Sequence, residues 1–268
     1  MLVVGVSIVA ALVVLAVLAP WLAPYKPHAI TGGSFETSSG AHLLGTNEAG
    51  ADIWSRIIWG SRVTLVVAVC ATGLVVTIGL AFGLIAGLRG GIADKAVMRA
   101  TDMFMAVPFL PLILFLVALI GPSLALSIVL IGLTFWPQTA RIVRSQTLTL
   151  RNRGFVDSAR GFGAGPFYVM RRHLAPALGP IIGANFVFLA GVTVTVEAGF
   201  ALIGIGDPGE ISWGAEIAQA ITSRSIQNGW VWLRWLVPAG VALSLAVVGF
   251  ALIGVAMEPR SNPRWNRS

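Results

Sequence analysis

Few residues of this chain have the types and spacing that enzyme catalysis requires. The three histidines, His28, His42 and His173, form no H-x-x-x-H pair for zinc, and no acidic cluster would hold magnesium. There is no G-x-x-x-x-G-K-[ST] phosphate loop, and the single cysteine, Cys70, can form no internal disulfide. We therefore expect no catalytic residue, no metal site and no cofactor bound by this chain, although it could depend on ATP bound by another subunit.

One carboxylate draws attention because of its surroundings. Glu197 is the only acidic residue placed well inside an apolar stretch long enough to span a bilayer. A carboxylate at such a position must face water, a partner or the interior of a helix bundle, which makes it a candidate residue of a translocation pathway. A structural hydrogen bond near the end of its helix explains it equally well, and both interpretations stay open.

A polar strip interrupts the apolar segments at residues 153–176, with the sequence RGFVDSARGFGAGPFYVMRRHLAP. The spacing predicts a helix over 151–162, a break at 163–166, and a second short helix over 167–174 that ends before Pro176. The strip is therefore expected to be a helix–turn–helix.

The first of these helices carries an apolar ridge among arginines. Phe155, Ala159 and Phe162 recur at i, i+4 and i+7, which places them on one helix face. Such a ridge could dock into a groove on a soluble protein, or it could lie on a membrane surface held by anionic lipid. The residues alone do not separate these two hypotheses.

The composition predicts what these residues are embedded in. Of the 268 residues, 56% are hydrophobic and 11% are charged, and the mean hydropathy is +0.86. Soluble domains carry about 25% charged residues. We therefore expect an all-α integral membrane protein. The net charge of +7 could suit nucleic acid, but the basic residues are scattered between apolar segments, so we expect membrane lipid rather than nucleic acid as a partner.

Six apolar stretches approach the roughly 20 residues that a bilayer-spanning helix needs. They are Leu2–Leu22, Val63–Leu88, Met103–Ile120, Ser123–Ala140, Pro180–Ile203 and Leu236–Met257. Only Gly121-Pro122 separates the third from the fourth, which predicts a tight hairpin. The first stretch has no preceding positive charge and is longer than a signal-peptide core, so we expect a retained anchor.

The distribution of lysine and arginine predicts the orientation. Of these 18 residues, 13 fall on one side of the six stretches, in the segments 89–99, 141–172 and 260–267. By the positive-inside rule this side is cytoplasmic, together with both termini and the polar strip. The external loops, 23–62 and 204–235, are rich in tryptophan. These tryptophans are expected to anchor at the membrane interface or to contact an external partner: Trp54, Trp59, Trp213, Trp230, Trp232 and Trp235.

The second stretch contains a doubled G-x-x-x-G motif. Gly79, Gly83 and Gly87 lie on one helix face, where small residues let helix backbones approach closely in lipid. We expect this face to pack against another helix, within the chain or on a partner.

Residues 157–176 resemble the cytoplasmic "EAA" loop of binding-protein-dependent ABC importer permeases. The family pattern is E-A-A, three residues, Gly, nine residues, then I-x-L-P. Asp157, Ser158 and Ala159 occupy its first triplet, Gly163 its glycine and Pro176 its last position.

Four more segments resemble the dipeptide/oligopeptide/nickel branch of that family, in particular its C-type subunit. They are HLLGTNEAGADIWSRIIWGSRVTL at 42–65, GGIADKAVMRATDMFMAVPFLPL at 90–112, WPQTARIVRSQTL at 136–148 and EAGFALIGIGDPGEISWG at 197–214. The chain departs from the family pattern at Asn47, Ala51, Asp157, Ser158 and Ala175.

The resemblance implies a type I importer in the bacterial inner membrane. Residues 1–62 would form a first helix and external loop, and 63–257 the transmembrane core with a coupling loop at 144–178 and an external loop at 204–235. Residues 258–268 would form a cytoplasmic tail. The polar strip would be the coupling helix, and its expected contacts with an ATPase are Phe155, Asp157, Ser158, Ala159, Arg160, Phe162, Gly163 and Pro176.

The implied partners are a second permease subunit, two cytoplasmic ATPases that bind ATP and Mg, and an external substrate-binding protein. Short peptides are the expected cargo, with nickel or another small chelate as the alternative. Two rivals belong to other classes: an ATP-independent channel or secondary transporter, and a membrane-embedded hydrolase or transferase. The first would not need an ATPase-docking loop, and the second would need a convergent nucleophile–base set.

Overall fold

A computed structural model of the chain describes residues 1–223 and 231–261, and every regular element in them is helical. Five helices are long and apolar enough to cross a membrane: α1 (Leu2–Leu22), α2 (Ile53–Arg89), α5 (Leu124–Leu150), α9 (Gly179–Leu202) and α11 (Val231–Ser261). A bent pair, α3 (Gly91–Ala106) and α4 (Phe109–Ile120), raises the number to six if it is one span. The expectation of an all-α protein with about six spans is confirmed.

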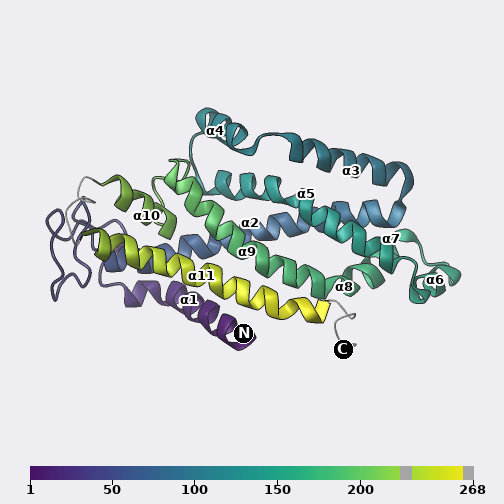
Figure 1. Cartoon of the computed structure of the whole chain (residues 1–268), viewed down its shortest axis with the longest axis horizontal. Helices are drawn as coiled ribbons and strands as arrows, with labels where there is room; N and C mark the ends of the chain where they lie inside the picture. Colours follow the sequence, from purple (N-terminus) through teal and green to yellow (C-terminus); the bar gives the residue numbers. More distant parts are fainter. Residues whose placement is uncertain (224–230, 262–268) are drawn as a thin grey trace.

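Helix α2 is the longest element and runs through the middle of the bundle (Figure 1). It begins at Ile53 rather than Val63, because the Oδ2 atom of Asp52 accepts a hydrogen bond from the amide of Ser55 at 2.8 Å and caps the first turn. Its 37 residues make it about 55 Å long. It therefore extends beyond the roughly 30 Å hydrocarbon core and links the two ends of the molecule.

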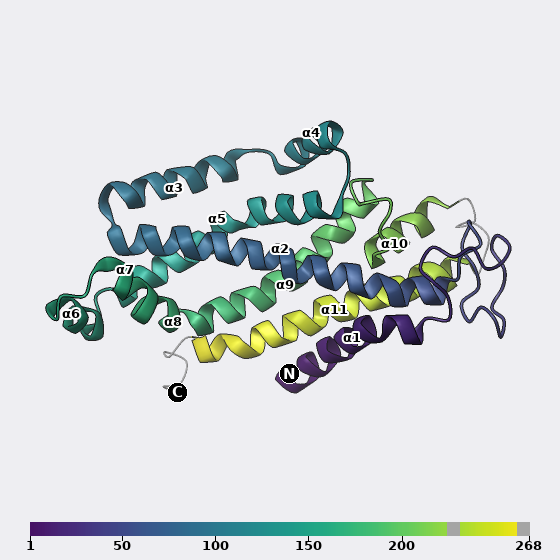
Figure 2. The same ribbon diagram turned by 180° about the vertical axis from the view of Figure 1, so that it is seen from behind.

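The glycines of α2 face α5. A Cβ atom added at Gly83 would lie 2.6 Å from the carbonyl oxygen of Ala140, and one at Gly79 would lie 2.6 Å from the Cβ atom of Thr139. Gly87 meets α5 one turn further on. The two helices lie side by side in both ribbon views (Figures 1 and 2), so the doubled G-x-x-x-G motif packs within the chain.

The prediction of a continuous third span over 103–120 is wrong. Helix α3 ends at Ala106, and α4 begins at Phe109 and leaves at 79°. Pro108 lacks an N–H group and disfavours helical dihedrals at the residue before it, and Val107 is extended with φ −74° and ψ 126°. The break therefore follows from one proline inside an apolar run.

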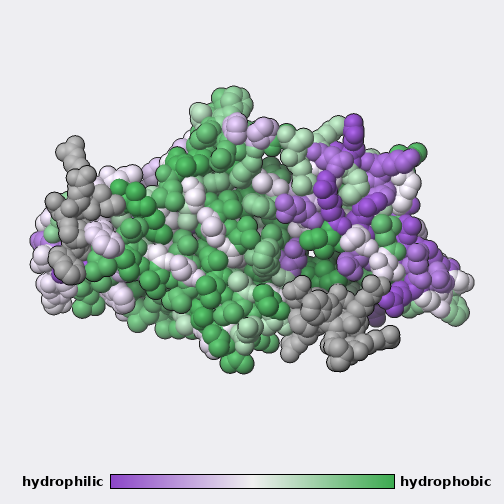
Figure 3. Space-filling view, viewed as in Figure 1, coloured by the Kyte–Doolittle hydropathy of each residue, from purple (hydrophilic) through white to green (hydrophobic). Residues whose placement is uncertain are grey.

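The remaining helices pack around α2 in layers. Helices α1 and α11 lie together on one side, α9 crosses the centre, and α3 and α4 form the opposite side (Figures 1 and 2). Large apolar side chains stay exposed along α1, α4 and α11. Hydrophobic residues cover the middle of the visible face, and hydrophilic residues gather over α6 (Gly154–Gly161), α7 (Pro166–Val169) and the first turns of α3 (Figure 3). This distribution suits a protein surrounded by lipid along its middle.

Two tryptophans expected at the membrane interface lie in the protein core. Trp213, the first residue of α10 (Trp213–Thr222), is fully buried, and its Nε1 donates to the carbonyl of Ile57 at 2.9 Å. Trp235 of α11 is buried as well. The expectation is wrong for these two because α10 folds back onto α2 and α11 and covers them. Trp54 and Trp232 are exposed, and Trp230 lies outside the described residues.

Candidate functional site

The polar strip projects from one end of the bundle (Figure 1). We call this end of the bundle the arginine-rich end. It begins after α5 and contains α6 (Gly154–Gly161), α7 (Pro166–Val169), a π-helical turn (Met170–Leu174) and α8 (Ala175–Ala177). At its base, Nη1 of Arg151 donates to the carbonyl of Gly87 at 2.9 Å and ties the strip to the end of α2.

The helix boundaries differ from the sequence prediction in two places. The first helix begins at Gly154, because α5 continues to Leu150 and is followed by a turn. The second helix does not end before Pro176. In the π-turn the amide of Ala175 donates to the carbonyl of Met170, and the wider turn accommodates the proline ring, so the chain continues through α8 into α9.

A small apolar core holds the strip against the bundle. Val156, Val169, Leu174 and Leu178 are fully buried and pack with Leu84 of α2 and Val143 of α5. Val156 is not one of the ridge residues predicted from the sequence. Its burial fits the amphipathic pattern of α6, in which the residue next to the predicted ridge faces inward.

The three residues of the predicted apolar ridge do not form one continuous face on α6. Ala159 is half-buried, Phe155 is 43% exposed, and Phe162 is 93% exposed because it follows the last helical residue of α6. The aromatic rings of Phe155 and Tyr168 lie 6.1 and 5.7 Å from the ring of His173. Together with Ser158, Ala164 and neighbouring glycines, these residues line an open groove of about 790 Å³.

The turn between α6 and α7 depends on one glycine. Gly163 has φ +82°, in the left-handed region that residues with a Cβ atom rarely adopt. Its amide donates to the carbonyl of Arg160, and the amide of Ala164 donates to that of Ala159, so the turn closes α6. The turn presents Phe162 at its tip.

The polar side chains of the strip have no partner in the part of the chain that the structure describes. Asp157, Ser158 and Arg160 are exposed, and among the described residues no side chain between 152 and 178 takes part in a hydrogen bond or an ion pair. The strip carries four such arginines: Arg153, Arg160, Arg171 and Arg172. A strip with exposed aromatic rings and unpaired charges has the chemistry of a docking surface for a protein.

Glu197 occupies a different environment. Its side chain is 7% exposed, near the opposite end of the bundle, where Oε1 accepts a hydrogen bond from the hydroxyl of Ser212 at 2.6 Å. Oε2 has no partner among the described residues. It borders a cavity of about 20 Å³ that Ser127 and Asp207 also line. Glu197 lies near the C-terminal end of α9, whereas the polar strip precedes the first residue of that helix, so the structure does not bring the two together.

Comparisons with known proteins identify the family of the chain. Residues 79–267, which include the strip, match the family model for the binding-protein-dependent transport system inner membrane component. The chain belongs to this family. Residues 1–43 also match the model for the N-terminal transmembrane domain of oligopeptide transport permease C.

Two curated relatives cover most of the chain. The nickel transport system permease protein NikC of Escherichia coli K12 is 36% identical over 261 residues, 96% of this chain and 91% of the relative. A putative peptide permease protein of Brucella suis is 35% identical over 246 residues, 91% of this chain and 80% of the relative. This chain is thus an ABC importer permease.

A solved structure confirms the architecture of the permease. The MetNI methionine ABC transporter in an inward-facing conformation matches with a TM-score of 0.57 at 21% identity, over 78% of this chain and 95% of that one. At this identity the match concerns the fold, which is that of a type I importer permease.

Two family motifs of this permease meet at the arginine-rich end. Arg144 donates two hydrogen bonds to Asp94, from Nε to Oδ1 and from Nη2 to Oδ2, and Nη2 lies 2.6 Å from Oδ2. Arg141 binds Asp102, also at 2.6 Å. The segments 90–112 and 136–148, which the sequence analysis treated separately, thus join α3 to α5 by two ion pairs.

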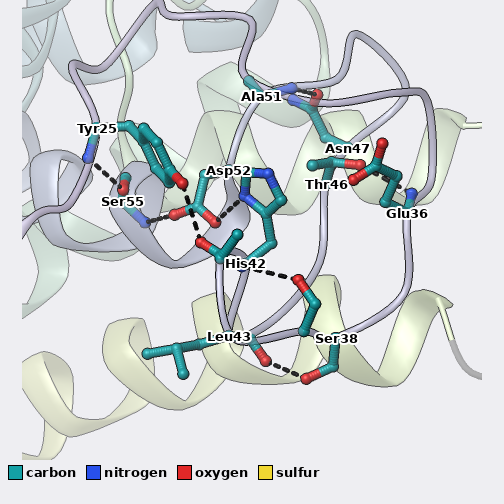
Figure 4. Close-up of polar contacts among 12 residues, drawn as sticks. Tyr25, Glu36, Ser38, His42, Leu43, Thr46, Asn47, Ala51, Asp52 and Ser55 are labelled. Atoms are coloured by element: carbon teal, nitrogen blue, oxygen red, sulfur yellow. Dashed lines mark hydrogen bonds and ion pairs between the residues drawn. The ribbon is translucent and has the colours of Figure 1, made fainter.

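The motif at 42–65 builds the loop at the opposite end of the permease (Figure 4). Nδ1 of His42 lies 3.0 Å from Oδ1 of Asp52, whose other oxygen caps α2. Oδ1 of Asn47 accepts hydrogen bonds from the amides of Ala49 and Ala51 at 3.0 and 2.9 Å. Because the asparagine oxygen makes these turn contacts, the departure from the family's aspartate is compatible with the loop.

One buried ion pair near this loop has no signal in the sequence. Arg56 of α2 donates through Nε and Nη2 to Oε1 of Glu216 at 2.8 and 2.6 Å, and Nε1 of Trp235 donates to Oε2 at 2.8 Å. Nη2 of Arg56 also reaches Gln219 at 3.2 Å. In the sequence Arg56, Glu216 and Gln219 resemble ordinary polar residues of external loops. Only the return of α10 onto α2 and α11 brings them together.

Proposed function

We propose that this chain is one of two permease subunits of an ATP-driven importer and that the polar strip couples it to a cytoplasmic ATPase. The observation that carries the proposal is the strip itself: four arginines without a partner among the described residues, exposed Phe155 and Phe162, and a groove between them. The arginine-rich end would face the cytoplasm, as the positive-inside rule predicts, and both termini would lie there.

In this scheme the permease binds no ATP of its own. Each of two ATPase subunits would bind ATP and Mg, and an external substrate-binding protein would deliver the ligand to the opposite end. Phe155, Ala159 and Phe162 would supply the apolar contacts of the docking surface, and Asp157, Ser158 and Arg160 the polar ones. Closure of the ATPases would move the strip, and α5 and α9, which flank it, would tilt as rigid bodies.

Co-purification tests the assembly. A tagged copy of this chain, extracted in mild detergent, should bring down a second permease and an ATPase. A complex without ATPase would contradict the proposal and favour a channel or a secondary transporter.

Substitutions in the strip test the coupling. Gly163→Pro should uncouple ATP hydrolysis from transport, so that hydrolysis no longer drives uptake. Proline cannot adopt the φ of +82° that Gly163 has in the turn. Reversal of both charges, Asp157→Arg with Arg160→Asp, should have the same effect. Gly161→Ala is the matched control, since a Cβ atom there meets no atom within 4 Å and its φ is not positive. Normal ligand-stimulated hydrolysis and uptake in both strip variants would disprove the coupling function.

We propose short peptides as the cargo and nickel or another small chelate as the alternative. The relatives support both, since one is named as a peptide permease and another as a nickel permease. The assay is to measure which ligand the partner binding protein captures, and then whether proteoliposomes with the whole transporter take up that ligand.

Glu197 is proposed as a residue of the translocation pathway, with a structural hydrogen bond to Ser212 as the alternative. Glu197→Gln keeps the shape and one hydrogen-bonding oxygen. Loss of uptake in a complex that assembles and melts normally would support the pathway assignment. Unchanged uptake would leave only the structural one.

A further inference from the structure

An open pocket lies at the end of the bundle opposite the arginine-rich end. It has a volume of about 360 Å³ and is lined by residues of α2, by the first residue of α5 and by the loop residues 27–28 and 210–211. Three exposed residues with polar side chains line it: His28, Arg62 and Glu210. Because the apolar stretch of α2 begins at Val63, Arg62 stands where the hydrocarbon core of a bilayer gives way to lipid headgroups.

The two charged residues of this pocket have no charged partner. The guanidinium carbon of Arg62 lies 5.3 Å from the centroid of the Trp59 ring, which is a cation–π contact. Trp59 is itself fixed, because its Nε1 donates to the carbonyl of Tyr25 at 3.2 Å. Within the described residues, Arg62 and Glu210 form no ion pair and no side-chain hydrogen bond. The N–H groups of the arginine and the carboxylate of the glutamate are thus available to a ligand that carries both signs of charge.

An uncovered apolar strip continues from the pocket along α2. Val66, Val69 and Gly73 follow Arg62 at i+4, i+7 and i+11, which places all four residues on one helix face. Val66 is 47% exposed and Val69 is 52% exposed, and a Cβ atom added at Gly73 would meet no atom within 4 Å. The strip therefore runs from the charged pocket toward the middle of the membrane.

We propose that this pocket binds a phospholipid with an amine headgroup, such as phosphatidylethanolamine. Its phosphate would accept hydrogen bonds from Arg62 and from a ring N–H of His28. Its ammonium group would bind Glu210, and an acyl chain would lie along Val66 and Val69.

The charges and the strip together favour this lipid over other ligands. A zwitterionic headgroup matches a pocket with one arginine and one glutamate, whereas a purely anionic headgroup would set its charge against Glu210 without an ammonium group to offset it. A short peptide is zwitterionic as well, but it has no acyl chain to cover the strip. The inference goes beyond the proposed transport function and depends neither on the ATPase nor on the cargo.

Native mass spectrometry of the whole transporter tests the proposal. The complex is stripped of lipid in detergent and then mixed with equal concentrations of phosphatidylethanolamine or phosphatidylglycerol, which is anionic and has no amine. We expect the parent to retain phosphatidylethanolamine several-fold more than phosphatidylglycerol. Arg62→Gln and Glu210→Gln should each lower this retention several-fold.

Lys26→Gln and Glu48→Gln are the matched controls and should retain the lipid like the parent. Both residues are exposed at the same end of the bundle and lie outside the pocket. Val66→Trp, which fills the top of the strip, should also lower retention and provides a second test if a charge variant assembles poorly. Its control is Val14→Trp on α1, since Val14 is similarly exposed.

Three results would overturn the proposal. Equal retention of the two lipids by the parent, or unchanged retention in the Arg62, Glu210 and Val66 variants, would mean that the pocket is not a site for this headgroup. Displacement of the lipid by dialanine would identify a peptide site instead. Absence of bound lipid from a parent complex that contains both permeases would mean that the other subunit covers the pocket.

Discussion

The two ends of this permease are built on opposite principles. At the end that contains residues 23–56 and 197–223, buried polar side chains have partners within the chain: Arg56 with Glu216, His42 with Asp52, and one carboxylate oxygen of Glu197 with Ser212. At the arginine-rich end, residues 152–178 have no described side-chain hydrogen bond, and the strip is attached to α2 and α5 by an apolar core and by the hydrogen bond from Arg151 at its base to Gly87.

The difference shows which end has completed its contacts within the chain. Buried polar groups are costly unless they are paired, so a paired network fixes the geometry of the first end. An exposed strip with aromatic rings, whose arginines have no partner in residues 1–223 and 231–261, keeps its binding capacity for another molecule. We infer that the first end is a rigid platform and that the strip is a surface whose partner lies outside this chain.

Arg56→Ala should give the largest effect, because it leaves Glu216 buried and unpaired. Loss of one member of a buried ion pair costs about 3–5 kcal/mol, and thermal unfolding of the purified complex would measure it. The double variant Arg56→Met with Glu216→Leu should recover most of the loss. A single variant as stable as the parent would show that the first end is not held by this network.

Gly83→Ala tests the close packing of α2, the helix that links the two ends, against α5. Its Cβ atom would lie 2.6 Å from the carbonyl oxygen of Ala140, a backbone atom that cannot move away easily. Such overpacking costs about 1–3 kcal/mol. Gly73→Ala, on the same helix with no atom within 4 Å, should be neutral or slightly stabilising. Equal melting temperatures of the two variants would contradict close packing of α2 on α5.

Val156→Ala should loosen the strip and leave the other end unchanged. The lost methyl groups and the remaining cavity cost about 1–2 kcal/mol. Hydrogen exchange should then accelerate in the amides of α6 but not in those of residues 23–52. Faster exchange at both ends would mean that the two ends unfold together.

Phe162→Ala should change stability least, within about 0.5 kcal/mol, because the side chain makes almost no contact within the chain. It should nevertheless weaken retention of the ATPase during purification. Full retention together with normal coupling would remove Phe162 from the docking surface.

The sequence was sufficient for the helical class, the number of spans and the position of the strip. Long apolar runs have few alternatives to helices in lipid, because every backbone group must be satisfied within the segment. The motif positions of Asp157, Gly163 and Pro176 indicated the family, and the comparisons confirmed it. The span over 103–120 was predicted wrongly because hydropathy does not register the effect of Pro108 on the backbone.

Tertiary structure decided which polar residues are partners. Arg56 and Glu216 are 160 positions apart, and Asp94 and Arg144 are 50 apart. No local pattern encodes such pairs, since they depend on how α10 and α3 return to the bundle. Local periodicity, proline and glycine act within a few residues and can be read from the sequence, whereas burial and pairing depend on the packing of distant helices.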